Sequence, residues 1–328
     1  MKNRQPAEWA DHQSVWTAWP SDPELWLEDL ALARAELAAL VRAIDDGGRG
    51  EVVDVVAANT ESVGDAQAAL KGTRARVHLL PFGDIWLRDT APVFVKGEGG
   101  LTAVDFAFNG WGGKYQLEHD DTVGAEIARL AKTPIRAAAW IFEGGAIDVD
   151  GTGLGVTTGQ CLLNPNRNPG FSREEIEARL SDDLGVDRLL WLGDGLLNDH
   201  TDGHVDNLAR FVAEGVLALP ESAGNDDPNA GVYTDARARA EAFGVKVVKL
   251  PSPGRVERDG KIVPASYMNF YIANTVVVVP LYGAPNDDAA VEAVGRLFPG
   301  RRVIGIRADH ILTGGGSFHC ITQQMPKV

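Results

Sequence analysis

The 328-residue chain contains only two cysteines, Cys161 and Cys320. Two cysteines cannot build the disulfide framework of a small secreted protein, so a reducing compartment is expected. Long apolar runs are also lacking: the four valines at 276–279 fall far short of the roughly 20 residues of a transmembrane helix. The first eight residues hold no apolar stretch of a signal peptide. These absences predict a cytoplasmic protein without a membrane partner.

Basic residues are scarce beside acidic ones, with 31 Lys and Arg against 46 Asp and Glu and a net charge of -15. Such a surface repels nucleic acid, so we expect no nucleic-acid partner. It would attract small cations, although many acidic proteins owe only their solubility to this charge. The chain also lacks a dinucleotide fingerprint and a phosphate-binding loop, because the glycines at 151–155 are not followed by a helix. No cofactor is therefore predicted.

Strand and helix patterns alternate along the chain. Helices are predicted at residues 23–45, 62–70, 121–131, 172–184 and 287–298. Strands are predicted at residues 51–57, 76–80, 101–106, 141–149, 153–158, 211–219, 246–249 and 275–280. The alternation predicts an α/β fold. No linker or low-complexity segment divides the chain, so one domain over residues 1–328 is expected.

Motif-bearing loops recur at intervals of about 50 to 60 residues, which indicates a repeated structural unit. They lie near residues 84–89, 143–148, 203–207, 267–274 and 314–320. The last of them places Cys320 and His319 after the glycines at 314–316. Consecutive glycines allow positive φ and a close approach of the backbone to a ligand. A thiol at this point is a candidate nucleophile.

The segment 203–207 contains a His-x-Asp pair, His204 and Asp206. In an extended segment these two side chains share one face, so a base and a carboxylate would project into one site. A surface histidine beside a capping aspartate is an alternative. A second alternative is a metal held by His200 and His204 with Asp202 or Asp206. The glycine and turn formers of this segment make it a poor helix for such a metal site, and no metal is predicted.

Residues 81–92 form a loop with crowded charges and an aromatic side chain. Asp84, Arg88 and Asp89 surround Trp86 between two prolines. Loops that combine aromatic and acidic residues are typical of binding sites. The alternative is a structural pair between Arg88 and one carboxylate, which leaves the other acid, Asp84, without a role in binding.

Two glycine-rich loops carry further candidates. Glu143 follows an apolar segment and precedes two glycines, so it is either a site carboxylate or part of a turn. Trp111 lies in the loop 109–115 and forms either a pocket wall or the centre of a tight turn.

One thiol among several carboxylates is an unusual set for a protease, whose substrate carbonyl is neutral. Carboxylates near a thiol raise its pKa and disfavour the thiolate. A positively charged substrate would offset them. A guanidinium suits this role because its planar fork pairs bidentately with carboxylates.

The motifs, taken in order, resemble the agmatine deiminases, a family that shares its label with the Porphyromonas-type peptidylarginine deiminases within the guanidine-modifying superfamily. The resemblance covers nearly the full chain, at residues 17–20, 85–90, 108–113, 142–145, 161–169, 203–207, 269–272 and 314–324. It implies a pentein fold, in which five ββαβ units surround a pseudo-fivefold axis with the site in the central channel. It also implies a homodimer.

The resemblance also implies the site and its reaction. Cys320 would be the nucleophile, His204 the general acid and base, and Glu143 the acid that orients the histidine. Asp89 and Asp206 would hold the guanidinium. The reaction would be hydrolysis of agmatine to N-carbamoylputrescine and ammonia through a thiouronium intermediate, a step toward putrescine.

Three alternatives to this reaction stay open. They are a peptidylarginine deiminase, an amidinotransferase and a pentein that binds without catalysis. The residues that recognise the substrate tail are the least defined. The candidates for the pocket wall around that tail are Trp86, Trp111 and Asp84.

Overall fold

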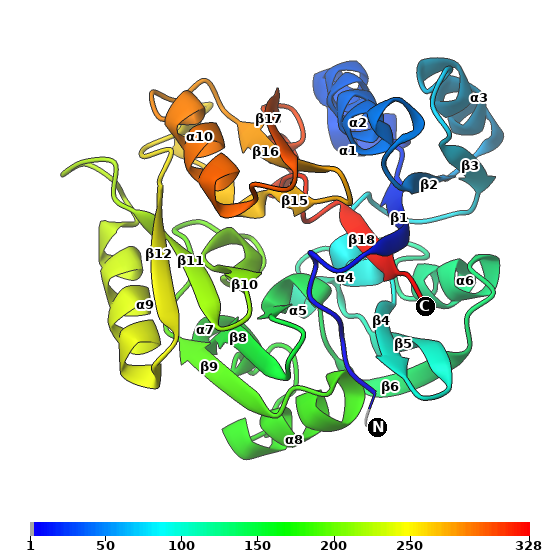
Figure 1. Ribbon diagram of the computed structural model, residues 1–328. Coiled ribbons are helices and arrows are strands. Elements are labelled where there is room, and N and C mark those ends of the chain that lie inside the picture. Colours follow the sequence, from blue (N-terminus) through cyan, green and yellow to red (C-terminus); the bar gives the residue numbers. More distant parts are fainter. Residues whose placement is uncertain (1–2) are drawn as a thin grey trace.

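The structure, a computed structural model, describes residues 3–328. Within these residues, five sheets share one pattern: an antiparallel strand pair is extended by a parallel strand that follows a helix. Four of the sheets follow one another along the chain (Figure 1). They are β4 (Val93–Gly97), β5 (Gly100–Ala107) and β6 (Ile135–Ile141); β7 (Ile147–Val149), β8 (Leu154–Thr158) and β9 (Arg188–Leu192); β10 (Arg210–Ala213), β11 (Val216–Glu221) and β12 (Lys246–Pro251); β15 (Tyr271–Ile272), β16 (Val276–Leu281) and β17 (Arg302–Arg307).

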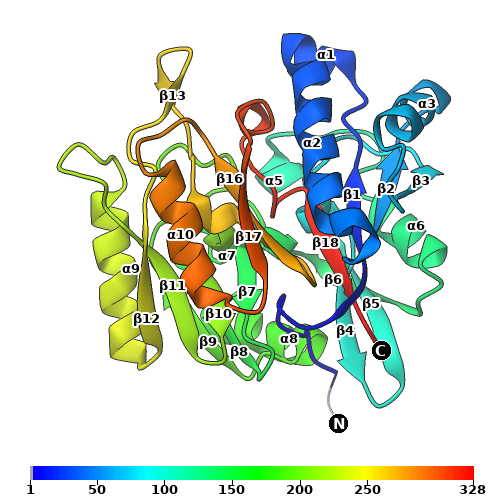
Figure 2. The same cartoon turned by 45° about the horizontal axis from the view of Figure 1, so that its top comes forward.

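The fifth sheet joins both ends of the chain. β18 (Thr322–Pro326) pairs antiparallel with β1 (His12–Ala18), and β1 lies parallel to β2 (Val52–Ala57). β3 (Arg76–Leu79) extends the sheet in parallel with β2. Because β18 is the last strand and directly follows Cys320, this pairing fixes the position of the candidate nucleophile. Figure 2 shows β18 beside β1.

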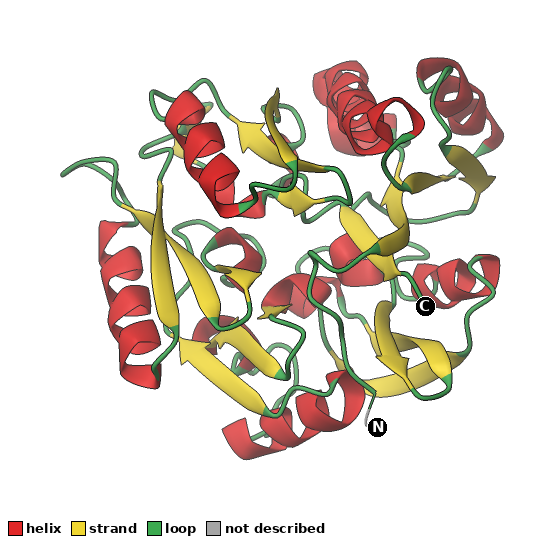
Figure 3. Cartoon of the chain, viewed as in Figure 1, coloured by secondary structure: helices red, strands yellow, loops and turns green. Residues whose placement is uncertain are grey.

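The longer helices lie on the outside of the molecule and the strands lie further in (Figure 3). They are α2 (Leu30–Asp45), α3 (Thr60–Ala69), α6 (Val123–Leu130), α8 (Arg173–Leu184), α9 (Ala230–Phe243) and α10 (Asp287–Leu297). In α2 the residues Ala33, Leu37, Leu40 and Ile44 are buried at the spacing of one helix face. Across the described residues, every helix falls short of the length and apolarity that a bilayer crossing requires.

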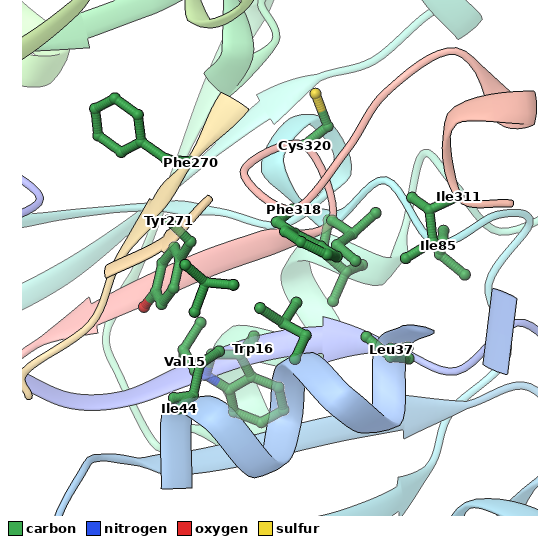
Figure 4. Close-up of a cluster of buried hydrophobic side chains, with 14 of the residues drawn as sticks. Val15, Trp16, Leu37, Ile44, Ile85, Phe270, Tyr271, Ile311, Phe318 and Cys320 are labelled. Atoms are coloured by element: carbon green, nitrogen blue, oxygen red, sulfur yellow. The ribbon is translucent and has the colours of Figure 1, made fainter. Parts of the chain in front are cut away.

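A large apolar cluster lies directly under the candidate nucleophile. Phe318 is fully buried in it, together with Val15, Leu37 and Ile85. In Figure 4 the Cys320 sulfur points away from the side chains that surround Phe318. The cluster therefore anchors one side of the loop while the sulfur faces the other.

The helix predicted at 172–184 is confirmed with its capping box of Ser172 and Glu175. The helix predicted at 23–45 is interrupted. It is divided into α1 (Pro23–Trp26), a 3-10 turn (Leu27–Asp29) and α2, with Leu27 at a φ of 46°. This break turns the Trp26 indole toward Asp84, which accepts its Nε1–H at 3.1 Å.

Two predicted strands are wrong in their extent. The segment 141–149 is not continuous, because β6 ends at Ile141 and β7 begins at Ile147 after a turn at Gly144–Ala146. The segment 211–219 is a hairpin of β10 and β11 rather than one strand. Several strands lacked a clear pattern and were not predicted: β1, β4, β6, β9, β17 and β18.

The five recurring loops have a common place in the fold. Each contains one short helical turn and leads into the first strand of one antiparallel pair. The turns are α4 (Leu87–Thr90), η3 (Gly144–Ala146), η4 (Val205–Asn207), η5 (Tyr267–Asn269) and η6 (Leu312–Gly314). The repeat indicated by the sequence is therefore a structural one, and it gathers the motif residues in one region.

Candidate active site

Cys320 lies at the meeting point of these loops, with 5% of its surface exposed. Asn269 donates from Nδ2 to its Sγ at 3.0 Å, and Asp206 Oδ2 lies 3.5 Å from the same sulfur. Burial, followed by Asp206 and Asp89, raises the pKa of the Cys320 thiol well above its usual value. Before a cation binds, Cys320 is therefore a neutral thiol, as the acidic motifs predicted.

The glycines before Cys320 are required by a tryptophan. A Cβ at Gly314 or Gly316 would come within 2.4 or 2.6 Å of the Trp86 ring, and only Gly315 of the three has a positive φ, 100°. The glycines were predicted to allow a ligand close to the backbone. In the structure the group that lies close to them is the indole of Trp86, which forms one wall beside the Cys320 sulfur.

His204 is buried between two carboxylates. Its Nε2 lies 3.5 Å from Glu143 Oε2, and its Nδ1 lies 3.7 Å from Asp89 Oδ2 without a hydrogen bond. Burial opposes the charged ring, but Asp89, Cys161 and Glu143 outweigh it and raise the pKa of His204 well above its usual value. The ring is therefore an imidazolium with one N–H that has no partner.

Glu143 is held as a carboxylate behind this histidine. Arg167 donates from Nε to Oε1 at 2.8 Å, and the Cys161 sulfur lies 3.9 Å from Oε2. Burial alone would raise the pKa of Glu143, but His204 and Arg167 lower it. Sequence reasoning assigned no role to Arg167 or Cys161, although both lie in the motif at 161–169.

Asp89 faces His204 from the loop of α4. The backbone N–H of Gly145 donates to Oδ1 and the Trp111 indole donates to Oδ2, each at 2.9 Å. Burial is the main cause that raises the pKa of Asp89. A Cβ on Gly145 would lie 2.6 Å from His204 Nδ1 and 3.0 Å from Asp89 Oδ1. Only glycine therefore fits between these groups.

Asp206 faces the same space from a 3-10 turn. The extended segment expected for His204 and Asp206 is wrong, since residues 205–207 are helical, yet both side chains still reach the site. His319 Nδ1 lies 2.7 Å from Asp206 Oδ2, while the buried Oδ1 has no partner among the described residues. Burial opposes the charge, but His319 lowers the pKa of Asp206.

A cavity of about 400 Å³ opens from Cys320 toward the surface. Trp86, Trp111 and Asp84 all contribute to its lining, together with Asp89. Asp84 accepts the indole N–H of Trp86 at 2.7 Å as well as that of Trp26, and burial raises the pKa of Asp84 to about 6. Its position is thus that of a support for two indoles. The full lining is Leu25, Trp26, Leu27, Glu28, Asp29, Asp84, Trp86, Asp89, Trp111, Tyr115, Leu117, His200, Thr201, Asp259, Thr313, Gly314, Gly315, Gly316 and Cys320.

Arg88 does not pair with an acid of its own loop, so the structural pair considered for that loop is wrong. It contacts Glu8 at 3.4 Å and donates to Gln323 Oε1 at 3.1 Å. Its backbone N–H also donates to the Cys320 carbonyl at 3.0 Å. Arg88 therefore helps to hold in place the loop that carries Cys320.

The metal alternative built on His200 does not fit. His200 lies at the cavity beside Tyr115, at 3.3 Å from its hydroxyl. In the part of the chain that the structure describes, the only convergent group of three such ligands is Glu143, Cys161 and His204. Arg167 already occupies the Glu143 carboxylate there, and a guanidinium beside a ligand disfavours a second cation.

Comparisons with known proteins point in one direction. The profile described as Porphyromonas-type peptidyl-arginine deiminase matches residues 4–326. A protein named agmatine deiminase from Stutzerimonas stutzeri (strain A1501) is 40% identical, with 98% of this chain and 95% of that protein covered.

Solved structures agree. The agmatine deiminase of Enterococcus faecalis has a TM-score of 0.93 at 33% identity and covers 99% of this chain and 96% of its own. A C. jejuni agmatine deiminase with substrate bound has a TM-score of 0.91 at 26% identity, covering 99% and 96%. An amidinotransferase from Microseira wollei shares the fold alone, with a TM-score of 0.59 at 12% identity over 99% of this chain and 97% of its own. The chain has the α/β fold of these agmatine deiminase structures, and it belongs to the Porphyromonas-type peptidyl-arginine deiminase family.

Proposed function

We propose that this chain is an agmatine deiminase, a hydrolase of linear amidines that converts agmatine to N-carbamoylputrescine and ammonia in putrescine biosynthesis. The family and the names of the relatives support a guanidine substrate. The charge of the cavity then selects among guanidines.

The single observation that carries the choice is the cavity lining. Among residues 3–328, five carboxylates contribute to it and no lysine or arginine does: Glu28, Asp29, Asp84, Asp89 and Asp259. Free arginine would bring an α-carboxylate into this acidic cavity without a cationic partner, and unpaired like charges are costly. Agmatine carries an ammonium at that end instead, which the acidic rim attracts.

The proposed reaction begins with the substrate held by two carboxylates. Asp89 and Asp206 would pair with the guanidinium nitrogens, with the unpartnered Asp206 Oδ1 as one acceptor. The bound cation offsets the charges that raise the Cys320 pKa, so the thiol releases its proton to solvent and is present as the thiolate. The sulfur then attacks the guanidinium carbon.

The proton transfers would pass through His204. A new bond forms between Sγ and carbon, the carbon–nitrogen bond breaks, and the imidazolium of His204 protonates the leaving nitrogen as ammonia. The neutral ring then takes a proton from water, whose oxygen adds to the thiouronium carbon. The carbon–sulfur bond breaks to return the Cys320 thiolate, the remaining hydroxyl proton of the adduct passes to solvent, and the neutral ureido product leaves.

Further expectations accompany this function. We infer that the five sheets are the blades of a pentein with pseudo-fivefold symmetry and that residues 1–328 form one domain. The repeated strand pattern and the shared placement of the five loops support this inference. The homodimer and the cytoplasmic location stay predictions.

The test is a carbamoyl assay with agmatine, free arginine and an arginyl peptide at equal concentration. We expect ureido product from agmatine at a rate at least about a hundredfold above that from arginine, because the site opposes a carboxylate at the tail. Preferred turnover of the peptide would instead make the chain a peptidylarginine deiminase. An added amine that is converted to a guanidine would make it an amidinotransferase, and no turnover would leave a binding protein.

A further inference from the structure

A second buried histidine, His319, directly precedes the nucleophile. Its Nδ1 lies 2.7 Å from Asp206 Oδ2 and its Nε2 lies 2.8 Å from Glu8 Oε2. The three side chains are 4% exposed or less. Since each ring nitrogen faces a carboxylate oxygen, which can only accept, both nitrogens donate and the ring is an imidazolium.

Glu8 comes from the chain segment that precedes β1. Its Oε1 accepts the backbone N–H of Ile272 at 2.7 Å, and its Oε2 lies 2.9 Å from Arg210 and 3.4 Å from Arg88. Burial would raise the pKa of Glu8, but Arg210 and His319 hold it well below its usual value. Glu8 is therefore a fixed carboxylate on the far side of His319 from the substrate carboxylate.

The groups around this chain of contacts decide which charges are stable. Asp206 is faced by cations, by the thiol and by the Asp89 carboxylate, and Glu8 by cations, one phenol and the Asp148 carboxylate. The titratable and charged groups that face the chain are Arg88, Asp89, Asp148, His204, Arg210, Tyr271, Arg301 and Cys320. Asp148 is itself paired with Arg210 at 3.3 Å. His319 contacts both carboxylates directly, at 2.8 Å from Glu8 and 2.7 Å from Asp206.

We propose that His319 and Glu8 are positioning residues for the guanidine reaction: Glu8 fixes the charged ring of His319, and the ring holds Asp206 ionised and oriented. The ring takes up Asp206 Oδ2 and leaves Oδ1 without a partner, so the carboxylate presents one open acceptor. The N-terminal segment thereby contributes to the strength of the substrate site although it does not line the cavity. This role rests on the proposed function.

The first experiment compares the pH dependence of kcat/KM for agmatine in the parent and in Glu8→Gln. Without the Glu8 carboxylate the ring loses its charged acceptor at Nε2 and is no longer held against Asp206, so Asp206 protonates at a higher pH. The acidic limb is expected to move up by about one pH unit, which is up to about tenfold in kcat/KM on the limb itself, with little change at pH 8.

A matched control alters the same segment without touching the charge chain. Arg4→Gln removes an exposed ion pair with Asp187 that anchors the start of the segment. Its acidic limb should superimpose on that of the parent. An equal loss at every pH in Glu8→Gln, or a shifted limb in Arg4→Gln as large as that in Glu8→Gln, would show a structural effect only and overturn the proposal.

A second measurement needs no folded Glu8 variant, which is useful because Glu8→Gln removes the carboxylate that pairs with Arg88 and leaves Arg210 paired with Asp148 alone. Histidine ring ¹⁵N signals are recorded in the parent, with His319 assigned by its loss in His319→Asn. We expect both ring nitrogens of His319 to carry a proton, as their contacts with Glu8 and Asp206 require. A neutral ring at pH 7 would overturn the proposal irrespective of the substrate. An imidazolium in a chain that turns over no guanidine would instead reject the proposed function, and with it the role of His319.

Discussion

Two buried histidines flank the nucleophile, and they differ in how tightly their nitrogens are held. His204 lies 3.5 Å from Glu143 and 3.7 Å from Asp89, and its Nδ1 makes no hydrogen bond. Both nitrogens of His319 lie within 2.8 Å of a carboxylate oxygen. The same residue types therefore form two units in one site. We call His204 with Glu143 and Asp89 the loose unit, and His319 with Glu8 and Asp206 the tight unit.

The difference separates two tasks. A proton can leave a nitrogen that has no strong acceptor bond once a substrate atom comes within reach, which is what a general acid requires. A ring clamped from both sides keeps its protons and acts as a fixed charge. We therefore assign proton transfer to His204 and charge placement to His319, and each of the following predictions tests this division.

The largest effect is expected at the sulfur that both units serve. Cys320→Ser should lower the turnover of agmatine by about 10⁴-fold or more, because a serine hydroxyl in this site is not ionised by a bound cation. Turnover is measured by ammonia release. Labelling by a haloacetamidine, followed by mass spectrometry, should be lost in this variant although Cys161 is intact. Retained ammonia release would show that Cys320 is not the nucleophile. The two histidine units would then have no common group on which to act.

The next prediction separates the two histidines directly. His204→Asn should lower kcat by about 10² to 10⁴-fold at every pH, since the group that exchanges protons is lost. His319→Asn should lower kcat/KM less and mainly below neutral pH, because Asp206 then protonates more readily. Steady-state kinetics from pH 5.5 to 9 distinguish the two. Similar profiles for both variants would contradict the division of tasks.

A methyl group between the two units should affect both. Gly145→Ala would place a Cβ 2.6 Å from His204 Nδ1 and 3.2 Å from Asp206 Oδ2, so these groups must move apart. We expect a loss of about a hundredfold in kcat/KM, as displacements near 1 Å produce. Gly64→Ala is the control, because its Cβ meets nothing within 4 Å in α3. Normal kinetics for Gly145→Ala would show that the site tolerates this expansion.

The sequence named every residue of the loose unit as a site residue, but only Asp206 of the tight unit. His204, Glu143, Asp89 and Cys320 lie in loops with glycines or paired acids, and these local patterns point to chemistry. Glu8 lies in an ordinary polar segment, and its role follows only from contacts with residues more than 200 positions away. Such contacts leave no local periodicity, so sequence reasoning could not find them.

The fold shows the same limit. Buried strands with continuous apolar residues, such as β2 and β16, were predicted, because runs of valine are typical of strands covered on both faces. The strand β18 reads Thr-Gln-Gln-Met-Pro and carries no such pattern, yet all its residues are buried against β1 and its neighbours. Its polar side chains serve the site, as Gln323 does for Arg88. The polar residues that serve the site therefore hide the apolar pattern by which β18 could have been recognised.

The smallest effect is expected from the neutral hydrogen bond that holds Asp89. Trp111→Phe removes the indole N–H that lowers the pKa of this carboxyl, so the pKa of Asp89, already raised by burial, should rise further. Protonated Asp89 does not attract a guanidinium; the KM for agmatine should therefore increase as pH falls through the raised pKa, with kcat nearly constant. One neutral hydrogen bond corresponds to about a two- to tenfold change in KM. The matched control is Trp140→Phe, which removes the equivalent bond from an indole to Asp183 in another part of the core and should leave the KM profile unchanged. A larger pH shift than that of His319→Asn would mean that the loose unit, and not the tight one, sets the ionisation of the substrate carboxylates.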